Sequence, residues 1–468
     1  MYNKEDSKNY FNKLSAYRIK WKKRNSFYHK LLEKYYKFFI PKNSKVLEIG
    51  CGTGELLKKV EPDFGVGIDF SENMIDIARQ NFPEYKFEID DAENLNINEK
   101  FDYIIISDLL TSLWDVQKVF SELKKVCHRK TKIIISTYNS LWGPILKFSE
   151  FLGLKSKQPI QNWLTVNDIN NLLQLEGFEI VKKEYKVLLP VYIPIIGFIY
   201  NRVFSNIPVI RKLCLVRFII ARPVEITSQE YSVSVLVPAR NEKGNIENAI
   251  LRTPKFGKSI EYIFVEGNSN DNTWEEILRV KEKYKNLNIV AIKQTGKGKG
   301  NAVREGFDIA TGDVLMILDA DLTMPPEDLP KFYNALAENK GEFINGCRLV
   351  YPMEKQAMRF LNLLGNLFFG AFLSFILGQK LKDTLCGTKV LLRKDYEIIK
   401  NNRAYFGDFD PFGDFDLIFG AAKLNLKIIE IIVRYKDRQY GSTQISRFKH
   451  GMILLKMSFF AAKKIKFI

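Results

Sequence analysis

The feature that most constrains the fold is the alternation of short apolar segments with segments of helical length. Four strand candidates occupy the first part of the chain: 45–50 (KVLEIG), 64–70 (FGVGIDF), 101–108 (FDYIIISD) and 131–137 (TKIIIST). Strands separated by helix-length segments predict a parallel sheet with helices on both faces.

A second series of the same kind begins at 231–242 (YSVSVLVPARNE) and continues at residues 259–269, 287–294 and 312–321. Each series has its own first strand and its own loop, so the 468-residue chain is expected to form two α/β domains. We expect residues 1–225 and 226–468, with the seam in 221–230, where a proline and polar residues interrupt the pattern.

The net charge of +17 favours acidic partners: nucleic acid, anionic lipid or phosphorylated small molecules. No nucleic-acid-binding signature accompanies the scattered basic residues, so nucleic acid is not expected as a partner. The five cysteines form no CxxC pair, which argues against a zinc site or a disulfide framework. The N-terminus is charged throughout and has no apolar core of a secretory signal, so a cytoplasmic location is expected.

Three apolar stretches bear on membrane association. Residues 187–201 contain two prolines and are too short to span a bilayer. Residues 360–379 carry no charge and are nominally long enough, but two Asn, a Ser and a Gln favour a buried or interfacial helix. Residues 450–468 pair apolar residues with lysines, which suits either a helix on an anionic membrane surface or an ordinary amphipathic helix closing the domain. We expect a peripheral protein on the inner face of the cell membrane.

A strand, a glycine-rich turn and a helix start follow one another in 46–57 (VLEIGCGTGELL). Gly50, Gly52 and Gly54 permit backbone angles and a close ligand approach that a Cβ would forbid. The next strand ends at Asp69, where a carboxylate can accept hydrogen bonds from both hydroxyls of a ribose. Asp91 follows the third strand region, where it can read an adenine amino group.

These motifs give residues 45–225 a resemblance to the class I S-adenosylmethionine-dependent methyltransferases, which have a Rossmann-like fold. Glu48, the glycine loop, Asp69 and the segment DAENL match that family in order and spacing. The resemblance implies that S-adenosylmethionine is the cofactor, that Asp69 holds its ribose and that Phe70 packs near its adenine. It also implies that Gly50 and Gly52 line the methionine portion. Glu48 can instead serve only to cap the loop, and Asp90 is expected to be solvated.

The sequence does not identify the methyl acceptor. None of the three histidines, His29, His128 and His450, stands at an obvious catalytic position. Tyr138 and Asn139 follow the fifth strand, where they either face the acceptor or form a turn.

In the second series, Asp319 and Asp321 lie at i and i+2 at the end of an apolar strand. In an extended strand, that spacing places both carboxylates on one side. A divalent cation such as Mg²⁺ or Mn²⁺, bound together with a diphosphate, requires such an oxygen pair. Two aspartates at a strand end can also be merely solvated, so the interpretation depends on the motifs around them.

Those surrounding motifs resemble glycosyltransferase family 2, with the GT-A fold, over residues 231–450. Its closest pattern is that of the dolichyl- or polyprenyl-phosphate sugar synthases, which transfer a sugar from a nucleotide to a lipid phosphate. The resemblance implies a nucleotide-sugar donor and a polyprenyl-phosphate or glycan acceptor. The matching segments, in order, are VPARNE (237–242), VEGNSNDNTW (265–274), TGKGKGNAVREGFDIATGD (295–313), GCR (346–348), KDTLCGTK (382–389) and DRQYGS (437–442).

The same resemblance assigns roles by position. Asp319 and Asp321 are expected to hold the metal and the diphosphate, and Asp271 to support the base-binding loop. The expected contacts of the nucleotide base and ribose are Pro238, Ala239 and Glu242.

Three further residues are expected near the reacting groups. Arg348 is expected to approach the sugar or the acceptor phosphate, and Arg438 the diphosphate. Asp416 aligns with an acid that acts as a base in many inverting relatives, and its neighbour Asp414 can take the same role. A phosphate acceptor is already anionic and needs no base, so Asp416 can instead organise its loop.

Two departures from the family pattern stand out. Glu266 and Gly267 replace the usual paired aspartates, which leaves the nucleotide preference open. The lysine that usually follows the Gly-x-Ser segment is missing from 441–444 (GSTQ), where Arg447 or Lys449 can substitute or the acceptor differs. Residues 407–416 (GDFDPFGDFD) form either a sugar-binding wall or a tight acidic loop.

We therefore expect a bifunctional enzyme that glycosylates a lipid-linked acceptor and methylates a related glycan or lipid. The alternative is a glycosyltransferase on a soluble glycan or protein, with the methyltransferase tailoring its product. A degenerate scaffold is less favoured because both motif sets are intact. A nucleic-acid methyltransferase would show basic and aromatic residues around its acceptor site, and the sequence shows no such cluster.

Overall fold

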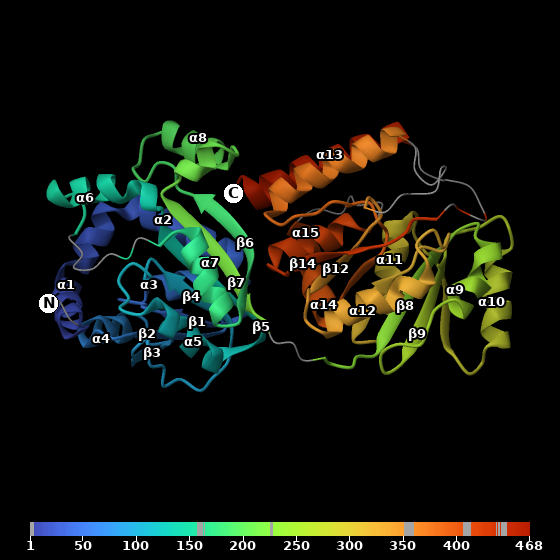
Figure 1. Ribbon diagram of the computed structural model, residues 1–468, viewed down its shortest axis with the longest axis horizontal. Helices are drawn as coiled ribbons and strands as arrows, with labels where there is room; N and C mark the ends of the chain where they lie inside the picture. The colour runs from blue at the N-terminus through green and yellow to red at the C-terminus, as the bar shows by residue number, and fades with distance from the viewer. Residues whose placement is uncertain are drawn as a thin grey trace. The chain divides into compact units, whose positions relative to one another are not determined.

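The chain forms two compact units in the computed structural model, residues 1–225 and 226–466 (Figure 1). The structure describes residues 4–156, 162, 164–224, 228–350, 360–405, 413–436, 438, 440 and 447–468. Each unit is built on one seven-stranded sheet with helices on both faces.

The sheet of unit 1 has the order β3-β2-β1-β4-β5-β7-β6. Six strands run parallel, and β7 runs antiparallel to both of its neighbours. The four strands predicted from the sequence are therefore parallel to one another, and β7 adds an antiparallel strand near one edge. Antiparallel neighbours need no crossover, and the chain passes from β6 into the adjacent β7 without crossing the sheet. The strands are β1 (Lys45–Ile49), β2 (Phe64–Asp69), β3 (Lys86–Ile89), β4 (Phe101–Ser107), β5 (Cys127–Tyr138), β6 (Phe178–Lys186) and β7 (Val216–Pro223).

Valine, leucine and isoleucine fill both faces of the central strands, as expected for a sheet covered on two sides. On one face, α2 places Tyr35, Tyr36 and Phe39 around Phe218 of β7, with ring centroids 5.3–5.7 Å apart. The helices of unit 1 are α1 (Lys4–Arg24), α2 (Ser26–Phe39), α3 (Glu55–Val60), α4 (Glu72–Asn81), α5 (Val116–Val126), α6 (Gly143–Phe151), α7 (Val166–Leu175) and α8 (Ile196–Arg202), with short 3₁₀ turns η1 (Ser140–Trp142), η2 (Phe204–Asn206) and η3 (Ile210–Leu213).

The sheet of unit 2 has the order β10-β9-β8-β11-β13-β12-β14, and β13 runs antiparallel to β11 and β12. The parallel strands β8, β9, β10 and β11 end at one edge, which is where parallel sheets place their ligands. The strands are β8 (Val233–Ala239), β9 (Ile260–Glu266), β10 (Asn288–Lys293), β11 (Val314–Ile317), β12 (Phe343–Cys347), β13 (Lys389–Leu392) and β14 (Ile428–Ile432).

The helices of unit 2 cover both faces of this sheet (Figure 1). They are α9 (Ile246–Leu251), α10 (Thr273–Lys283), α11 (Lys299–Asp308), α12 (Leu329–Ala337), α13 (Phe360–Leu377), α14 (Arg393–Asn401), α15 (Phe415–Lys423) and α16 (Arg447–Ala461), with 3₁₀ turns η4 (Lys243–Asn245), η5 (Pro326–Asp328) and η6 (Arg403–Tyr405) and a π-helical turn η7 (Ala462–Lys466).

Helix α13 is the charge-free stretch of the sequence, and it is buried on one side. Leu373 and Ile376 are fully buried, whereas Leu367 and Phe368 are about half exposed. Phe372 packs edge-on against Phe459 of α16, with ring centroids 5.7 Å apart. Within the described part of the chain, no helix is long and apolar enough to cross a membrane.

Candidate functional sites

The glycine loop of unit 1 needs residues without a side chain. Gly50 and Gly52 have φ angles of 72° and 54°, and a Cβ on Gly50 would lie 2.8 Å from Leu109 Cδ1. The backbone N–H groups of Gly50 and Cys51 donate to the carbonyl of Ile68, at 2.8 and 2.9 Å. These bonds fix the loop against the end of β2.

Asp69, at the end of β2, is bound to this loop. Its Oδ2 accepts from the N–H of Gly52 and its Oδ1 from the N–H of Ser71, both at 2.9 Å. Burial raises the pKa of Asp69, while these backbone bonds and the charge of Arg18 act in the opposite direction. Each carboxylate oxygen keeps a lone pair for a ligand hydroxyl.

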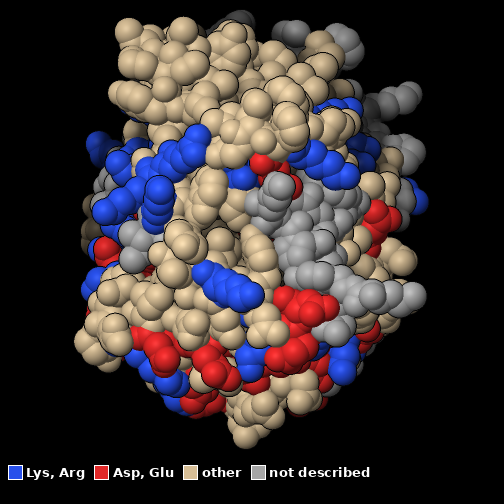
Figure 2. All heavy atoms as spheres, turned by 90° about the vertical axis from the view of Figure 1, so that its left-hand side faces the viewer, with Lys and Arg blue, Asp and Glu red and all other residues tan. Residues whose placement is uncertain are grey.

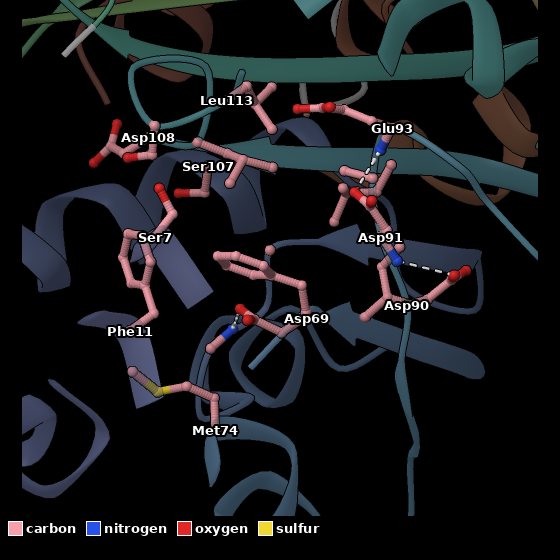
Figure 3. A pocket seen from close by; sticks show the side chains of 18 of the residues that line it. Ser7, Phe11, Asp69, Met74, Asp90, Asp91, Glu93, Ser107, Asp108 and Leu113 are labelled. Atoms are coloured by element: carbon pink, nitrogen blue, oxygen red, sulfur yellow. Dashed lines mark hydrogen bonds between the residues drawn. The ribbon is translucent and has the colours of Figure 1, made fainter. Parts of the chain in front are cut away.

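A cavity of about 180 Å³ opens between the loop and helix α1 (Figure 3). Ser7 and Phe11 of α1 lie on one side of it, and the loop after β3 lies on the other. Five of the residues predicted to bind the cofactor line this cavity: Gly50, Gly52, Asp69, Phe70 and Asp91. Glu48 and Gly54 are not among its lining residues.

The loop after β3 closes one end of the cavity. Asp91 pairs with Lys4 of α1 at 2.5 Å, and Phe70 meets Phe11 edge to face at 5.6 Å between centroids. Asp90 was expected to be solvated, but it is 8% exposed. It accepts hydrogen bonds from the N–H of Asp91 and from both nitrogens of Asn96, so the loop itself satisfies this carboxylate.

Glu48 lies beneath the loop. It is 3% exposed, and burial raises its pKa to about 8, with the charge of Lys22 opposing the rise. Its Oε2 has no hydrogen-bond partner among the described residues. Gly54 serves a different purpose, because it precedes α3 at a φ of 81°, where a Cβ would overlap Phe87.

Helices α1 and α2 contribute two residues that sequence reasoning missed. Arg18 places Nη2 3.3 Å from where a Cβ on Gly52 would lie, and its Nε is buried without a partner among the described residues. Burial, with the charges of Lys22 and Arg18, lowers the pKa of His29 to about 3. Both residues line the cavity. No motif marks them, because only the tertiary fold brings α1 and α2 over the loop.

A carboxylate just after the end of β4 also lines the cavity. Asp108 has a left-handed backbone (φ 53°) and accepts hydrogen bonds from Tyr28 Oη at 2.6 Å and Ser136 Oγ at 2.9 Å. Burial raises the pKa of Asp108 above its ordinary value. Tyr138 lies beside Tyr28, with ring centroids 6.2 Å apart, and also lines the cavity.

Tyr138 and Asn139, the two residues that the sequence suggested for the methyl-acceptor side, therefore have different roles in the structure. Tyr138 reaches the cavity, whereas Asn139 forms a turn. The Asn139 amide donates to the carbonyls of Lys212 and Cys214, and its side-chain oxygen accepts from Leu141 N–H.

In unit 2, Asp319 and Asp321 lie beyond the strand rather than within it. Strand β11 ends at Ile317, and Leu322 N–H donates to the carbonyl of Asp319 at 3.1 Å to close a turn. The expectation that an extended strand aligns the two carboxylates is therefore wrong. Instead, separate cations hold them: Lys299 lies 2.6 Å from Asp319, and Arg438 lies 2.6 Å from Asp321.

These ion pairs belong to a larger set of charges. Burial opposes the ionisation of Asp319, but the charge of Lys299 outweighs it, and the pKa of Asp319 lies below its ordinary value. Arg438 also contacts Glu242 at 3.2 Å. Burial raises the pKa of Glu242 to about 7, with the charge of Arg438 opposing the rise.

The loop after β8 and the loop after β9 are tied together beside this set. Asp271 accepts from Lys243 N–H and from Tyr440 Oη, both at 3.2 Å. Pro238 and Ala239 form the end of β8, and the Ala239 carbonyl accepts from Gly267 N–H at 2.9 Å.

Glu266, one of the two departures from the family pattern, turns its carboxylate back to its own loop and accepts from Ser269 N–H at 2.5 Å. The other departure, 441–444, lies outside the described residues, as do the side chains of Arg447 and Lys449.

Asp414 and Asp416 have different partners. Asp414 lies 3.8 Å from Lys299, and thus beside Asp319. Asp416 contacts Arg304 at 3.3 Å and Arg403 at 3.4 Å. A carboxylate bound by two guanidinium groups is a weak base, so this arrangement suits an organising role for Asp416. Residues 406–412 of the acidic and aromatic segment lie outside the described residues.

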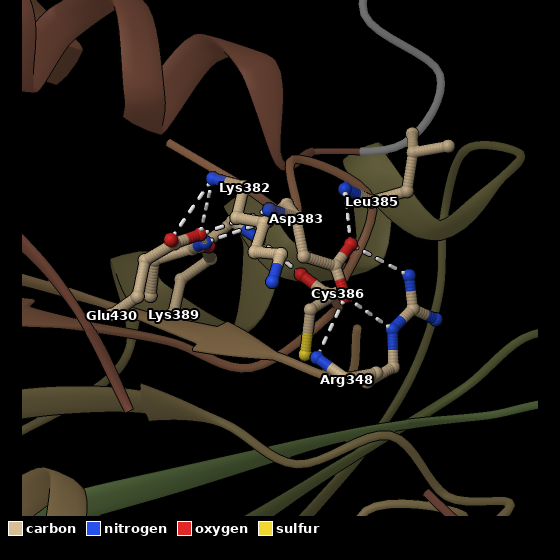
Figure 4. Close-up of polar contacts among 8 residues, drawn as sticks. Arg348, Lys382, Asp383, Leu385, Cys386, Lys389 and Glu430 are labelled. Atoms are coloured by element: carbon tan, nitrogen blue, oxygen red, sulfur yellow. Dashed lines mark hydrogen bonds and ion pairs between the residues drawn. The ribbon is translucent and has the colours of Figure 1, made fainter. Parts of the chain in front are cut away.

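Arg348 is held in place by a buried carboxylate (Figure 4). Its Nε and Nη2 donate to the two oxygens of Asp383 at 2.7 and 2.9 Å, and its guanidinium lies 5.0 Å over the ring of Tyr435. Burial opposes the ionisation of Asp383, but the charge of Arg348 keeps its pKa below the ordinary value.

The loop that carries Asp383 continues to Gly387, where a Cβ would overlap the Asp319 carboxylate and Lys299. Glycine at this position therefore lets the loop lie directly against the first of the two aspartates.

The residues present fit the groups that the motifs imply. In unit 1, the glycine loop, the Asp69 carboxylate and the partnerless Nε of Arg18 suit a ligand with a ribose and an anionic end. In unit 2, none of the described residues forms a group of three or more His, Cys, Asp or Glu placed to hold a metal ion. Asp319 and Asp321 supply two oxygen ligands, which suits a hard cation whose other ligands come from a diphosphate and water.

In comparison with known proteins, each unit matches a different family model. Residues 40–185 match the family model described as a methyltransferase domain. Residues 234–399 match the model of glycosyl transferase family 2. The chain contains one domain similar to each of these families. Its methyltransferase domain contains the glycine loop and Asp69, and its glycosyltransferase domain contains Asp319 and Asp321.

The glycosyltransferase domain resembles polyprenyl-phosphate sugar transferases. A dolichol-phosphate mannosyltransferase of Pyrococcus furiosus is 38% identical over 121 residues, which are 25% of this chain and 33% of that protein. An undecaprenyl-phosphate 4-deoxy-4-formamido-L-arabinose transferase of Enterobacter sp. is 31% identical over 225 residues, 46% of this chain and 63% of that protein. The chain thus spans less than two thirds of the length of either relative.

Among solved structures, a SAM-dependent methyltransferase from Thermotoga maritima is 16% identical, with a TM-score of 0.36, and the match covers 46% of this chain and 98% of that one.

Proposed function

We propose that the glycosyltransferase domain transfers a sugar from a nucleotide-sugar to a polyprenyl phosphate. We propose further that the methyltransferase domain methylates a related glycan or lipid with S-adenosylmethionine. The observation that carries the first proposal is the pairing of Asp319 with Lys299 and of Asp321 with Arg438. This edge holds two carboxylates for a divalent cation and two cations that a diphosphate can engage. The names of the curated relatives support a polyprenyl-phosphate acceptor.

In the sugar transfer, an oxygen of the acceptor phosphate forms a bond to the anomeric carbon. The bond from that carbon to the diphosphate breaks, and the diphosphate leaves with the electron pair. Arg438 and Lys299 face the growing charge on the leaving group, while Glu242 and Asp271 hold the loops around the base. A bound divalent cation supplies further positive charge at the leaving diphosphate. A phosphate acceptor needs no base, which agrees with the two arginines on Asp416.

In the methyltransferase domain, Asp69 binds the ribose hydroxyls and Phe70 and Phe11 enclose the adenine, with Asp91 near its amino group. Arg18 receives the carboxylate of the methionine portion, because a buried guanidinium N–H without a partner favours an anion. Bound S-adenosylmethionine would supply the methyl group to an acceptor hydroxyl or amine, and the electron pair of the carbon–sulfur bond would stay on sulfur. Asp108 also lines the cavity, where it can take the proton that the acceptor loses.

The glycosyltransferase proposal is tested with Asp321→Ala. We expect turnover of the best nucleotide-sugar donor to fall by at least about a hundredfold, as when one strong electrostatic contact is lost from a site of this kind. Release of nucleotide is measured with Mg²⁺ or Mn²⁺, with and without polyprenyl phosphate. Glu282→Ala, which removes a carboxylate that is 75% exposed, is the matched control. Full, chelator-insensitive turnover in Asp321→Ala would remove the metal from the mechanism. Equal rates with a soluble glycan acceptor would favour that alternative.

The role of Asp108 is tested with Asp108→Asn. The amide keeps the shape of the side chain but cannot accept a proton, so methyl transfer should fall by about a hundredfold or more. Because the pKa of Asp108 is raised, the wild-type rate should rise with pH as this carboxyl ionises, and the variant should lose that dependence. Affinity for S-adenosylmethionine should stay within a few fold. Asp76→Asn, at a 63% exposed carboxylate, is the control. An unchanged pH profile in Asp108→Asn would exclude Asp108 as the base.

A further inference from the structure

An apolar surface covers one side of unit 1. Most of the exposed large apolar side chains described in this unit come from two segments, 140–156 and 187–213, which we call the α6–α8 face. Figure 1 places α6 and α8 on the same side of the unit, and Figure 2 shows uncharged side chains gathered there, above a band of Lys and Arg. The most exposed members are Leu141, Phe148, Phe151, Tyr192, Ile195, Phe198 and Val209.

The α6–α8 face has the reverse of the usual amphipathic pattern. Ile195 and Val209 are 76% and 77% exposed, whereas Asn201, Ser205 and Asn206 are at most 4% exposed. The polar side chains point inward because they bind the backbone of the segment. The Asn201 side chain, for example, binds both the N–H and the carbonyl of Leu189. In the folded segment, the polar side chains are therefore buried and the apolar side chains are exposed.

The two segments are joined into one structure. Trp142 Nε1 donates to the carbonyl of Leu213 at 2.7 Å, and the Asn139 amide binds the carbonyls of Lys212 and Cys214. On α2, Phe27 packs edge to face on Tyr192, with ring centroids 5.5 Å apart. An ordered apolar surface of this extent indicates a binding surface.

Cations predominate among the charged residues of the α6–α8 face. Residues 187–213 contain no Asp or Glu, but they contain Arg202, Arg211 and Lys212. The acid of 140–156, Glu150, is paired with Lys155, and Lys147 is exposed on α6. Apolar and aromatic side chains with cations beside them match the boundary between the acyl chains and the anionic headgroups of a bilayer.

We propose that the α6–α8 face docks the methyltransferase domain on an anionic lipid bilayer. Helices α6 and α8 have 9 and 7 residues, too short to span a bilayer but suited to lie in its interface. The face shares helix α2 with the cavity, since Phe27 contacts Tyr192 while the next two residues, Tyr28 and His29, lie toward the cavity side. Docking therefore brings the methyl-transfer site to the membrane surface, whatever acceptor the glycosyltransferase domain uses.

The test is sedimentation of the full chain with phosphatidylcholine vesicles, with and without phosphatidylglycerol. The triple variant Phe151→Asp, Ile195→Asp, Val209→Asp removes three side chains that are 76–81% exposed, so the fold should survive. The control triple, Leu175→Asp, Leu251→Asp, Leu278→Asp, adds the same charge at exposed positions outside the face. Binding of S-adenosylmethionine to each protein reports the fold of unit 1.

We expect the wild type and the control triple to bind the anionic vesicles, more weakly as salt rises. The face triple should bind them at least about tenfold more weakly, since binding follows apolar area and charge together. Equal binding of the face triple and the wild type, or no binding by the wild type, would overturn the proposal. So would a wild-type dimer, without vesicles, that the face triple converts to monomer, because the face would then join two copies of the chain.

Discussion

At the residue scale, both domains hold carboxylates in surroundings that disfavour their charge. Burial raises the pKa of Glu48 to about 8, that of Glu242 to about 7, and that of Asp108 above its ordinary value. Asp319 shows the opposite shift, because Lys299 lies against it. Carboxyl groups with shifted pKa values are concentrated where proteins bind charged ligands or transfer protons.

Glu48 makes the stability of the methyltransferase domain depend on pH. Its carboxyl keeps its proton in the folded state up to about pH 8, whereas in the unfolded state it loses the proton near 4.5. Unfolding therefore releases a proton between these values, and the free energy of unfolding should fall as pH rises, by up to about 1.4 kcal/mol per unit. Glu48→Gln should flatten this slope. The slope is measured by calorimetry at a series of pH values. The unfolding transition of the methyltransferase domain is recognised because S-adenosylmethionine shifts it.

Glu72→Gln, at a carboxylate that is 56% exposed, should keep the wild-type slope. If Glu48→Gln kept it as well, another group would be responsible, and the buried carboxyl would be charged in the folded protein.

The site residues that the sequence predicts are those within a local motif. Gly50, Gly52 and Asp69 are recognisable because the loop and the strand end are contiguous in the chain. Arg18, His29 and Asp108 were missed, because helices and a strand distant in sequence bring them to the cavity. Asn139 was left open for the same reason, since its partners are the carbonyls of Lys212 and Cys214. Asp90 was misjudged although its partners, Asp91 and Asn96, are near in sequence, because the pattern does not show how the loop folds back on this carboxylate.

At the element scale, alternating apolar and helical segments predicted both sheets, but not every strand direction. The antiparallel strand β7 follows the segment 187–213, and the strand pattern in the sequence assigned neither β6 nor β7. The early end of β11 at Ile317 depends on a turn that an apolar run does not reveal. Local patterns thus fix the type of element, and tertiary pairing fixes its direction and its end.

Helix α13 offers a test of the element assignments. Leu373 is fully buried and Leu367 is 45% exposed on the same helix. Leu373→Ala should lower the free energy of unfolding of unit 2 by about 2–5 kcal/mol, and Leu367→Ala by less than about 1 kcal/mol. Calorimetry with and without S-adenosylmethionine distinguishes the unfolding transitions of the two units, since the ligand should shift the transition of unit 1 and leave that of unit 2 unchanged. Equal effects of the two changes would contradict the packing of α13 in the domain.

At the scale of the whole molecule, each compact unit has its own sheet, its own core and its own candidate site. The strands and loops that hold Asp69 belong to unit 1, and those that hold Asp321 belong to unit 2. We therefore expect damage to one site to leave the other intact, and neither domain to be a scaffold for its neighbour.

The most direct measurement is a paired assay of Asp69→Ala and Asp321→Ala. Calorimetric titration of S-adenosylmethionine and nucleotide release from the best sugar donor are measured on both proteins and the wild type. Asp69→Ala should weaken S-adenosylmethionine by about tenfold or more, through loss of the ribose bonds, and keep its sugar-donor turnover. Asp321→Ala should show the reverse. If either variant lost both activities or neither, the account of two separate transferase sites in one chain would be contradicted.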